Sequence, residues 1–227
     1  MDVRISHSPA YAMATVVLAY GEEVLVERSS MTAMSPGVSV VGTVGSGGVG
    51  GAVKRKLFGG QAAFWGRYRS EIEGAWVKAG PRFPGDLLDV KMTGGPGLLC
   101  EAGAAVLVCG NVDVDVAWGG LRNVVMQTGL TLLRLEGVGD AVIGSYGGIE
   151  PHWLEEGQHI VVDTGHLVGW DASVTLSVRA LGSVATSAVT GEWVVGVAEG
   201  PGRVYLQTRA ERDIKSWLFP SGWQNER

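Results

Sequence analysis

The sequence has few charged residues, two cysteines and no long apolar run. Charged residues make up 18% of the 227 positions, and the net charge is −5. An acidic balance opposes attraction to phosphate backbones and disfavours nucleic acid as a partner. No apolar run approaches the roughly 20 residues of a membrane span, and residues 1–10 lack the basic and apolar regions of a signal peptide. We therefore expect a cytoplasmic protein, with peripheral attachment to a membrane as a further possibility.

The sequence also lacks a catalytic constellation. Cys100 and Cys109 are nine positions apart in apolar runs, which is no metal or redox spacing, and we expect two core thiols in a reducing compartment. His159, Asp163 and His166 lie close in sequence, but a zinc site needs a fuller ligand set, so structural roles are favoured. No catalytic, cofactor-binding or metal-binding residue is predicted, and the chain is predicted not to be an enzyme.

What the sequence has in abundance is the material of β-structure. Hydrophobic residues are 46% of the chain, and 36 glycines interrupt short β-branched runs at the close spacing of sandwiches and barrels. Residues 112–116 alternate valine with aspartate, as in a strand with one buried face. Only residues 209–218 are typical of a helix, with Ile214, Trp217 and Leu218 on one face. The sequence predicts an all-β fold with one short C-terminal helix and a flexible tail over residues 221–227.

Three segments of the chain share one pattern. In each, two apolar residues precede a carboxylate, which is followed by small turn residues and another strand; the carboxylates are Glu27, Glu101 and Asp163. Glu101 and Asp163 are 62 positions apart, as are Val142 and Val204. We predict three pseudo-symmetric copies, at about residues 10–84, 85–148 and 149–209, within one domain over residues 1–220. The first copy is longer by about eight residues, which we place at 42–51.

The recurring carboxylates have two interpretations. Three of them around a threefold axis could bind a cation or raise one another's pKa. A carboxylate before a small-residue turn also accepts backbone N–H bonds, and a repeated fold repeats its turns. The second interpretation needs no ligand and is favoured.

Several short motifs, in order, resemble one known family. They include Pro9-Ala10-Tyr11, Met34-Ser35-Pro36-Gly37-Val38, Pro84-Gly85-Asp86, Ser145-Tyr146-Gly147, Val162-Asp163-Thr164-Gly165-His166 and Val204-Tyr205-Leu206-Gln207-Thr208-Arg209. The chain resembles, from about Pro9 to Pro220, the family of unknown function that includes the mitochondrial biogenesis "altered inheritance of mitochondria" protein. The resemblance implies a fold like that of the tryptophan RNA-binding attenuator protein, with double-stranded β-helix or β-sandwich units repeated about a pseudo-threefold axis. Residues 64–69 depart from the family's usual alternation.

The most unusual local feature is a basic and aromatic segment over residues 52–69. It contains no acidic residue, and its candidate interaction residues are Lys54, Arg55, Lys56, Phe58, Trp65, Arg67 and Arg69. Such a surface could dock on anionic lipid headgroups or on an acidic protein partner. Alternatively, the segment is a long hairpin whose aromatic residues pack on the sheet while its basic residues face water.

These observations favour a non-enzymatic scaffold or interaction protein. It would self-associate as a homo-oligomer through exposed strand edges and dock on a membrane surface or a protein partner. The alternative function is a small-ligand or RNA-binding module of the attenuator-protein-like fold.

Overall fold

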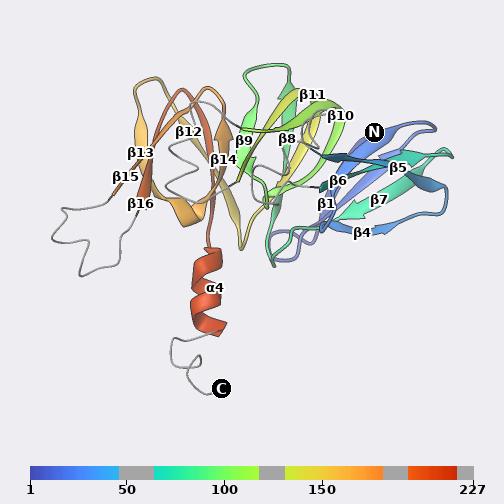
Figure 1. Cartoon of the computed structure of the whole chain (residues 1–227), viewed down its shortest axis with the longest axis horizontal. Coiled ribbons are helices and arrows are strands. Elements are labelled where there is room, and N and C mark those ends of the chain that lie inside the picture. Colours follow the sequence, from blue (N-terminus) through green and yellow to red (C-terminus); the bar gives the residue numbers. More distant parts are fainter. Residues whose placement is uncertain (46–63, 118–130, 181–193, 219–227) are drawn as a thin grey trace.

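The computed structural model describes residues 1–45, 64–117, 131–180 and 194–218, and these are almost entirely antiparallel strands (Figure 1). We call the parts of the chain that hold the three predicted copies the first, second and third segments. The first segment holds β1 (Asp2–Ser6), β2 (Met13–Leu18), β3 (Glu23–Glu27), β4 (Met31–Met34), β5 (Val38–Gly45), β6 (Phe64–Ser70) and β7 (Ala75–Ala79). The second holds β8 (Leu87–Thr93), β9 (Leu98–Glu101), β10 (Ala105–Val116) and β11 (Leu132–Gly144). The third holds β12 (Ile149–Leu154), β13 (His159–Asp163), β14 (Leu167–Asp171), β15 (Thr175–Ala180), β16 (Val194–Glu199) and β17 (Gly202–Gln207). The all-β class is confirmed.

Alternation of side chains explains why these segments are strands. In β2, Ala14, Val16 and Leu18 are fully buried, while the residues between them are only partly covered. Successive side chains of a strand point to opposite faces, so this period of two places one face on the core. No helix among the described residues is long and apolar enough to cross a membrane.

One pairing scheme recurs in all three segments. In the first segment β7 lies between β2 and β4, and β6 lies between β3 and β5. In the third, β17 lies between β12 and β14, and β16 lies between β13 and β15. In the second, the long strands β10 and β11 each take the place of two shorter strands of the other segments, so that β11 pairs with β8, β9 and β10. Three copies of one unit would produce this recurrence.

A β-bulge recurs at the matching place in each segment. It lies at the fifth residue after the recurring carboxylate. At that residue, β4, β10 or β14 has one residue more than the neighbouring strand, and the register passes over it. The extra residues are Thr32, Val106 and Val168. A bulge bends its strand and increases its twist, so the three segments bend alike where they leave the carboxylate turn.

The segments are joined in a row by two pairings between strands. β10 of the second segment pairs antiparallel with β3 of the first, and β14 of the third pairs antiparallel with β9 of the second. These two junctions produce a ten-stranded sheet that passes through all three segments. A four-stranded sheet, β1-β2-β7-β4, and a three-stranded sheet, β13-β16-β15, are left at opposite ends of the molecule (Figure 1).

The strand register refines the sequence alignment by one residue. Leu107 and Gly169 are equivalent, but Leu107 pairs with Val142 whereas Gly169 pairs with Tyr205. The last strands of the second and third segments are therefore 63 positions apart, not 62. The additional residue falls between β15 and β16, in a hairpin whose connection lies outside the described residues. The extra residues expected at 42–51 fall mostly outside the described residues too.

The C-terminal helix α4 (Glu211–Leu218) was predicted over residues 209–218 and is confirmed, although it begins two residues later. Its expected apolar face is not covered by the body of the protein. Trp217 and Leu218 are 76% and 50% exposed, and the helix projects away from the sheets (Figure 1). The expected flexible tail lies outside the described residues.

Candidate functional site

The recurring carboxylates all end a strand and begin a three-residue turn. The Glu27 Oε2 accepts the Ser29 backbone N–H at 2.8 Å, and the Asp163 Oδ1 accepts the Gly165 backbone N–H at 3.0 Å. Burial alone raises the pKa of Asp163, but hydrogen bonds from Arg212 and Gly165 outweigh it and lower that pKa. These two carboxylates therefore act as turn acceptors. The pairings place the three turns in three different segments of the row and do not bring them together.

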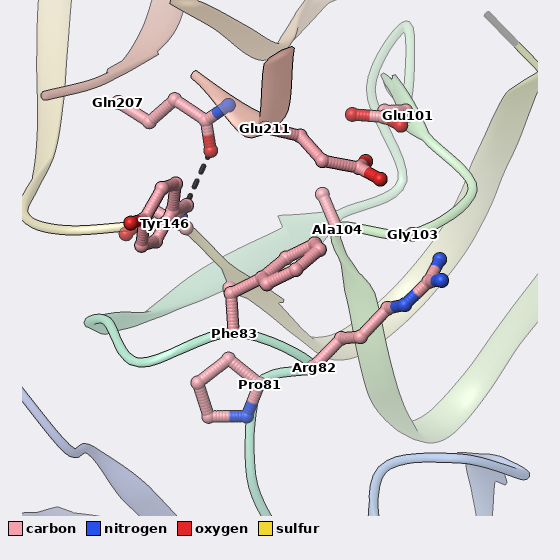
Figure 2. Close-up of a pocket in the computed structure, with 11 residues that line it drawn as sticks. Pro81, Arg82, Phe83, Glu101, Gly103, Ala104, Tyr146, Gln207 and Glu211 are labelled. Atoms are coloured by element: carbon pink, nitrogen blue, oxygen red, sulfur yellow. Dashed lines mark hydrogen bonds between the residues drawn. The ribbon is translucent and has the colours of Figure 1, made fainter. Parts of the chain in front are cut away.

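Glu101 departs from this pattern because its side chain faces a depression between the segments (Figure 2). Three connecting stretches of the chain, 80–86, 144–148 and 207–210, meet there. The Asp86 N–H donates to the Gly147 carbonyl at 2.9 Å, and the Thr208 N–H donates to the Gly148 carbonyl at 3.0 Å. The depression is small, with a volume of about 40 Å³.

The depression gathers opposite charges. Burial raises the pKa of the Glu101 carboxyl, the nearby charge of Glu211 raises it further, and Arg82 opposes both. On the other side of the depression, the Tyr146 N–H donates to the Gln207 side-chain carbonyl at 2.9 Å (Figure 2). The space holds no more than a few water molecules, and ligand binding between the segments stays a prediction.

The residues expected to form a basic and aromatic surface are separated by the structure. Lys54, Arg55, Lys56 and Phe58 lie outside the described residues. Trp65 is 1% exposed and belongs to a core cluster that also contains Leu133 and Tyr205. The structure contradicts its place in an exposed surface, because this cluster covers the face of β6 that carries Trp65 at that residue.

The two arginines of that surface lie on β6 beside an acidic residue. The Arg67 Nη1 is 2.8 Å from the Glu23 Oε2, and the Arg69 Nη1 is 3.9 Å from the other oxygen of Glu23. Both guanidinium groups are about half exposed. Because Glu23 offsets part of their charge, they offer less attraction to an anionic surface than the sequence suggested.

The two cysteines and His166 lie in surroundings that favour a structural role. Cys100 and Cys109 are free and buried, and burial raises the pKa of each thiol to about 12. The His166 Nδ1 lies 2.8 Å from the Gln207 backbone carbonyl, in the turn after β13. Within the described residues, no three His, Cys, Asp or Glu side chains are grouped so that they could hold a metal ion.

Two edge strands stand out when the segments are compared. The counterparts of β4 in the other segments, β10 and β14, both pair across a junction, and so do the counterparts of β13, which are β3 and β9. Among the described residues β4 pairs only with β7, and β13 pairs only with β16. Beside β13 lies a groove of about 510 Å³, lined by residues that include His152, Ile160, Val161 and Leu206. The sequence offsets of the repeat could have identified this pair of edges.

The fold and these edges define a class of all-β proteins in which sheets pass from one segment to the next by strand pairing. The chain belongs to the family described as mitochondrial biogenesis AIM24, whose family model matches residues 3–209. This confirms the resemblance seen in the sequence motifs.

Two proteins of Streptococcus pyogenes are similar to this chain. An uncharacterised protein of serotype M6 is 23% identical over 215 residues, which cover 92% of this chain and 86% of that protein. A protein solved by X-ray crystallography in a structural genomics programme matches with a TM-score of 0.76 and 21% identity, and the match covers 96% of this chain and 97% of that one. The second likeness shows a common fold.

Proposed function

We propose that this protein is a non-enzymatic scaffold that self-associates through the edges of its sheets. The observation that supports the proposal is that neighbouring segments of the chain already associate in this way. Unpaired N–H and C=O groups on an edge strand are a template for pairing with another chain. The end strands β4 and β13 have such an edge, while their counterparts in the body are paired.

Multi-angle light scattering over a series of concentrations tests self-association. We expect the mass of the full chain to rise above that of a monomer as its concentration rises, because an association by a short edge is concentration-dependent. A mass that stays at the monomer value at the highest concentration would contradict the proposal.

The second part of the proposal is that the scaffold docks on an anionic membrane surface or an acidic protein partner. Its support is the basic run Lys54, Arg55 and Lys56 with Phe58 close by. Each basic residue near an anionic membrane contributes about 1 kcal/mol of attraction. Arg67 and Arg69 contribute less, since both lie next to Glu23.

Co-sedimentation with liposomes tests the docking. The triple variant K54E/R55E/K56E is expected to lose at least about tenfold in binding to vesicles that contain anionic lipid. The matched control reverses three exposed basic residues elsewhere, Arg4, Arg28 and Arg209, which changes the net charge equally. Equal losses in the two variants would mean that only overall charge matters. No binding by the wild-type chain would leave a protein partner as the docking target.

A further inference from the structure

The two junctions inside the chain have the same register. Counted from the carboxylate that ends β3 or β9, the residues one, two and three places before it pair across the junction. Their partners are the residues six, seven and eight places after the carboxylate of the following segment. The pairs are Val26 with Leu107, Leu25 with Val108 and Val24 with Cys109 at one junction, and Cys100 with Gly169, Leu99 with Trp170 and Leu98 with Asp171 at the other.

The same register can be applied once more, to the third segment of one molecule and the first segment of another. The first segment offers the residues after its own carboxylate Glu27, which lie in and just after β4. The third segment offers the residues before its carboxylate Asp163, which lie in β13. This register pairs Ala33 with Val162, Met34 with Val161, and Ser35 with Ile160. Because β4 and β13 lie at opposite ends of one molecule (Figure 1), these pairs form only between two copies.

The central pair of each junction supports this reading. Inside the chain, that pair is Leu25 with Val108 and Leu99 with Trp170, and Val108, Leu99 and Trp170 are all at most 5% exposed. The matching residues at the ends are Met34 and Val161, which are also apolar but are 37% and 49% exposed. Their exposure is what an unoccupied junction leaves, and pairing would cover both side chains.

The second segment has a pocket between β8 and β9 that the third segment borders. Asp171 of β14 and Arg203 of β17 line it together with residues of β8 and β9. In the third segment, the groove of about 510 Å³ between β12 and β13 has no such neighbour among the described residues. A strand paired with β13 would border the groove in the same way.

The net charges of the first and third segments are opposite over the whole sequence, and the surplus of the first comes from Lys54, Arg55 and Lys56, which lie outside the described residues. Residues 10–84 hold eight Lys or Arg and five Asp or Glu, which gives +3, whereas residues 149–209 hold three and seven, which gives −4. Opposite net charges favour contact between unlike ends over contact between like ends.

We infer that the partner of these edges is a second copy of this chain, bound head to tail, with β4 of one copy antiparallel to β13 of the next in the register Met34 opposite Val161. The four-stranded sheet of one molecule and the three-stranded sheet of the next then become one sheet. The inference rests on the self-association proposed above and specifies its surface. A head-to-tail contact leaves one free edge at each end, so it propagates into a ring or a filament.

Disulfide trapping tests the register directly. Two single variants, M34C and V161C, are oxidised separately and as a mixture, and the native thiols do not interfere because Cys100 and Cys109 are buried. Cysteines directly opposite on antiparallel strands are within reach of a disulfide. We expect a linked dimer in the mixture and little in either variant alone. The double variant M34C/V161C is expected to give a ladder of linked oligomers.

The outcomes separate this inference from the broader proposal. If light scattering shows self-association but the mixture gives no more linked dimer than the single variants, the β4–β13 contact is wrong and the self-associating scaffold stands. Linked dimers of M34C alone would indicate a twofold contact between like ends and would also overturn it. If the wild-type chain stays monomeric, both fail.

A charged edge provides a second test that keeps the end sheets intact. The variant V161K places an ammonium group opposite the apolar Met34 of the next copy and should weaken self-association at least about tenfold. V138K is the matched control, because Val138 is a strand valine that is 59% exposed on β11, away from both edges. A small fraction of V161K added to wild-type protein should shorten the assemblies, since its β4 still binds but its β13 does not. Equal behaviour of V161K and V138K would contradict the inference.

Discussion

At the scale of single residues, Glu101 is the recurring carboxylate whose surroundings differ from those of the other two, Glu27 and Asp163. Glu27 and Asp163 accept the N–H of the residue two places on, whereas Glu101 faces a depression where three connections of the chain meet. Its raised pKa follows first from burial and then from the charge of Glu211. The place that holds a turn acceptor in the other two segments therefore holds, in the second segment, a carboxylate whose charged form is disfavoured.

This gives a prediction about stability and pH. Since the pKa of Glu101 in the folded state lies above its unfolded value of about 4.3, the stability that its proton provides is complete below that value. It is lost as the pH rises through the folded pKa. Glu101→Gln should therefore raise the Tm at neutral pH, by about 2–4 °C, and the gain should shrink towards pH 4. Thermal unfolding followed by circular dichroism measures it.

The control for this prediction is Glu71→Gln, which removes an exposed carboxylate and should leave the Tm nearly unchanged. A Tm that falls in Glu101→Gln at neutral pH would mean that the attraction of Arg82 outweighs burial, contrary to the sign expected here.

At the scale of elements, the connection 80–86 is held by close backbone contact. Ala12 donates its N–H to the Gly85 carbonyl at 2.9 Å, and Gly85 also forms an isolated bridge with Gly147. A Cβ on Gly85 would lie 1.9 Å from the Ser145 carbonyl oxygen. Only glycine fits there without a shift of the connection 144–148, so this contact fixes how closely the connections 80–86 and 144–148 approach each other.

Gly85→Ala should destabilise the fold by about 1–3 kcal/mol, the usual cost of overpacking a tight contact. Urea denaturation measures the change. Gly95→Ala is the control, because a Cβ there meets no atom within 4 Å. Similar losses in the two variants would show that the contact with Ser145 does not set the cost.

The sequence predicts the elements well where a residue type is tied to a conformation. The carboxylate and small-residue turns mark the ends of β3, β9 and β13, and their spacing relates the three segments. The bulges lie at Thr32, Val106 and Val168. These are β-branched residues of the kind that also fills regular strands, so residue type does not mark a bulge and its position follows from strand pairing. Trp65 was misplaced because the alternation of residues 64–69 puts it on the same face of β6 as Arg67 and Arg69. Tertiary packing covers that face at Trp65 and leaves both arginines about half exposed.

At the scale of the whole molecule, the pairings between described residues join the three segments in a row, and none of them closes the row into a ring. Two junctions of equal register leave an unlike edge at each end, and this could not be predicted from local patterns, since a row and a ring use the same strands. Whether the segments are related by a pseudo-threefold axis, as the family resemblance implies, stays a prediction.

The unequal charge of the two ends gives a prediction at this scale. Raising the ionic strength from low to high should weaken self-association several-fold, because salt screens the attraction between the basic first segment and the acidic third one. Sedimentation velocity at a fixed protein concentration measures the change. An association that strengthens with salt would indicate that apolar burial at Met34 and Val161 dominates the contact.

The equal register of the two junctions also bears on synthesis of the chain. While the protein is being made, β3 is complete long before its partner β10 has left the ribosome, so the nascent first segment presents an edge that any copy of β4, β10 or β14 fits. Crowded translation of one messenger would then favour exchange of strands between neighbouring nascent chains. The length of time for which β3 stays unpaired sets that hazard.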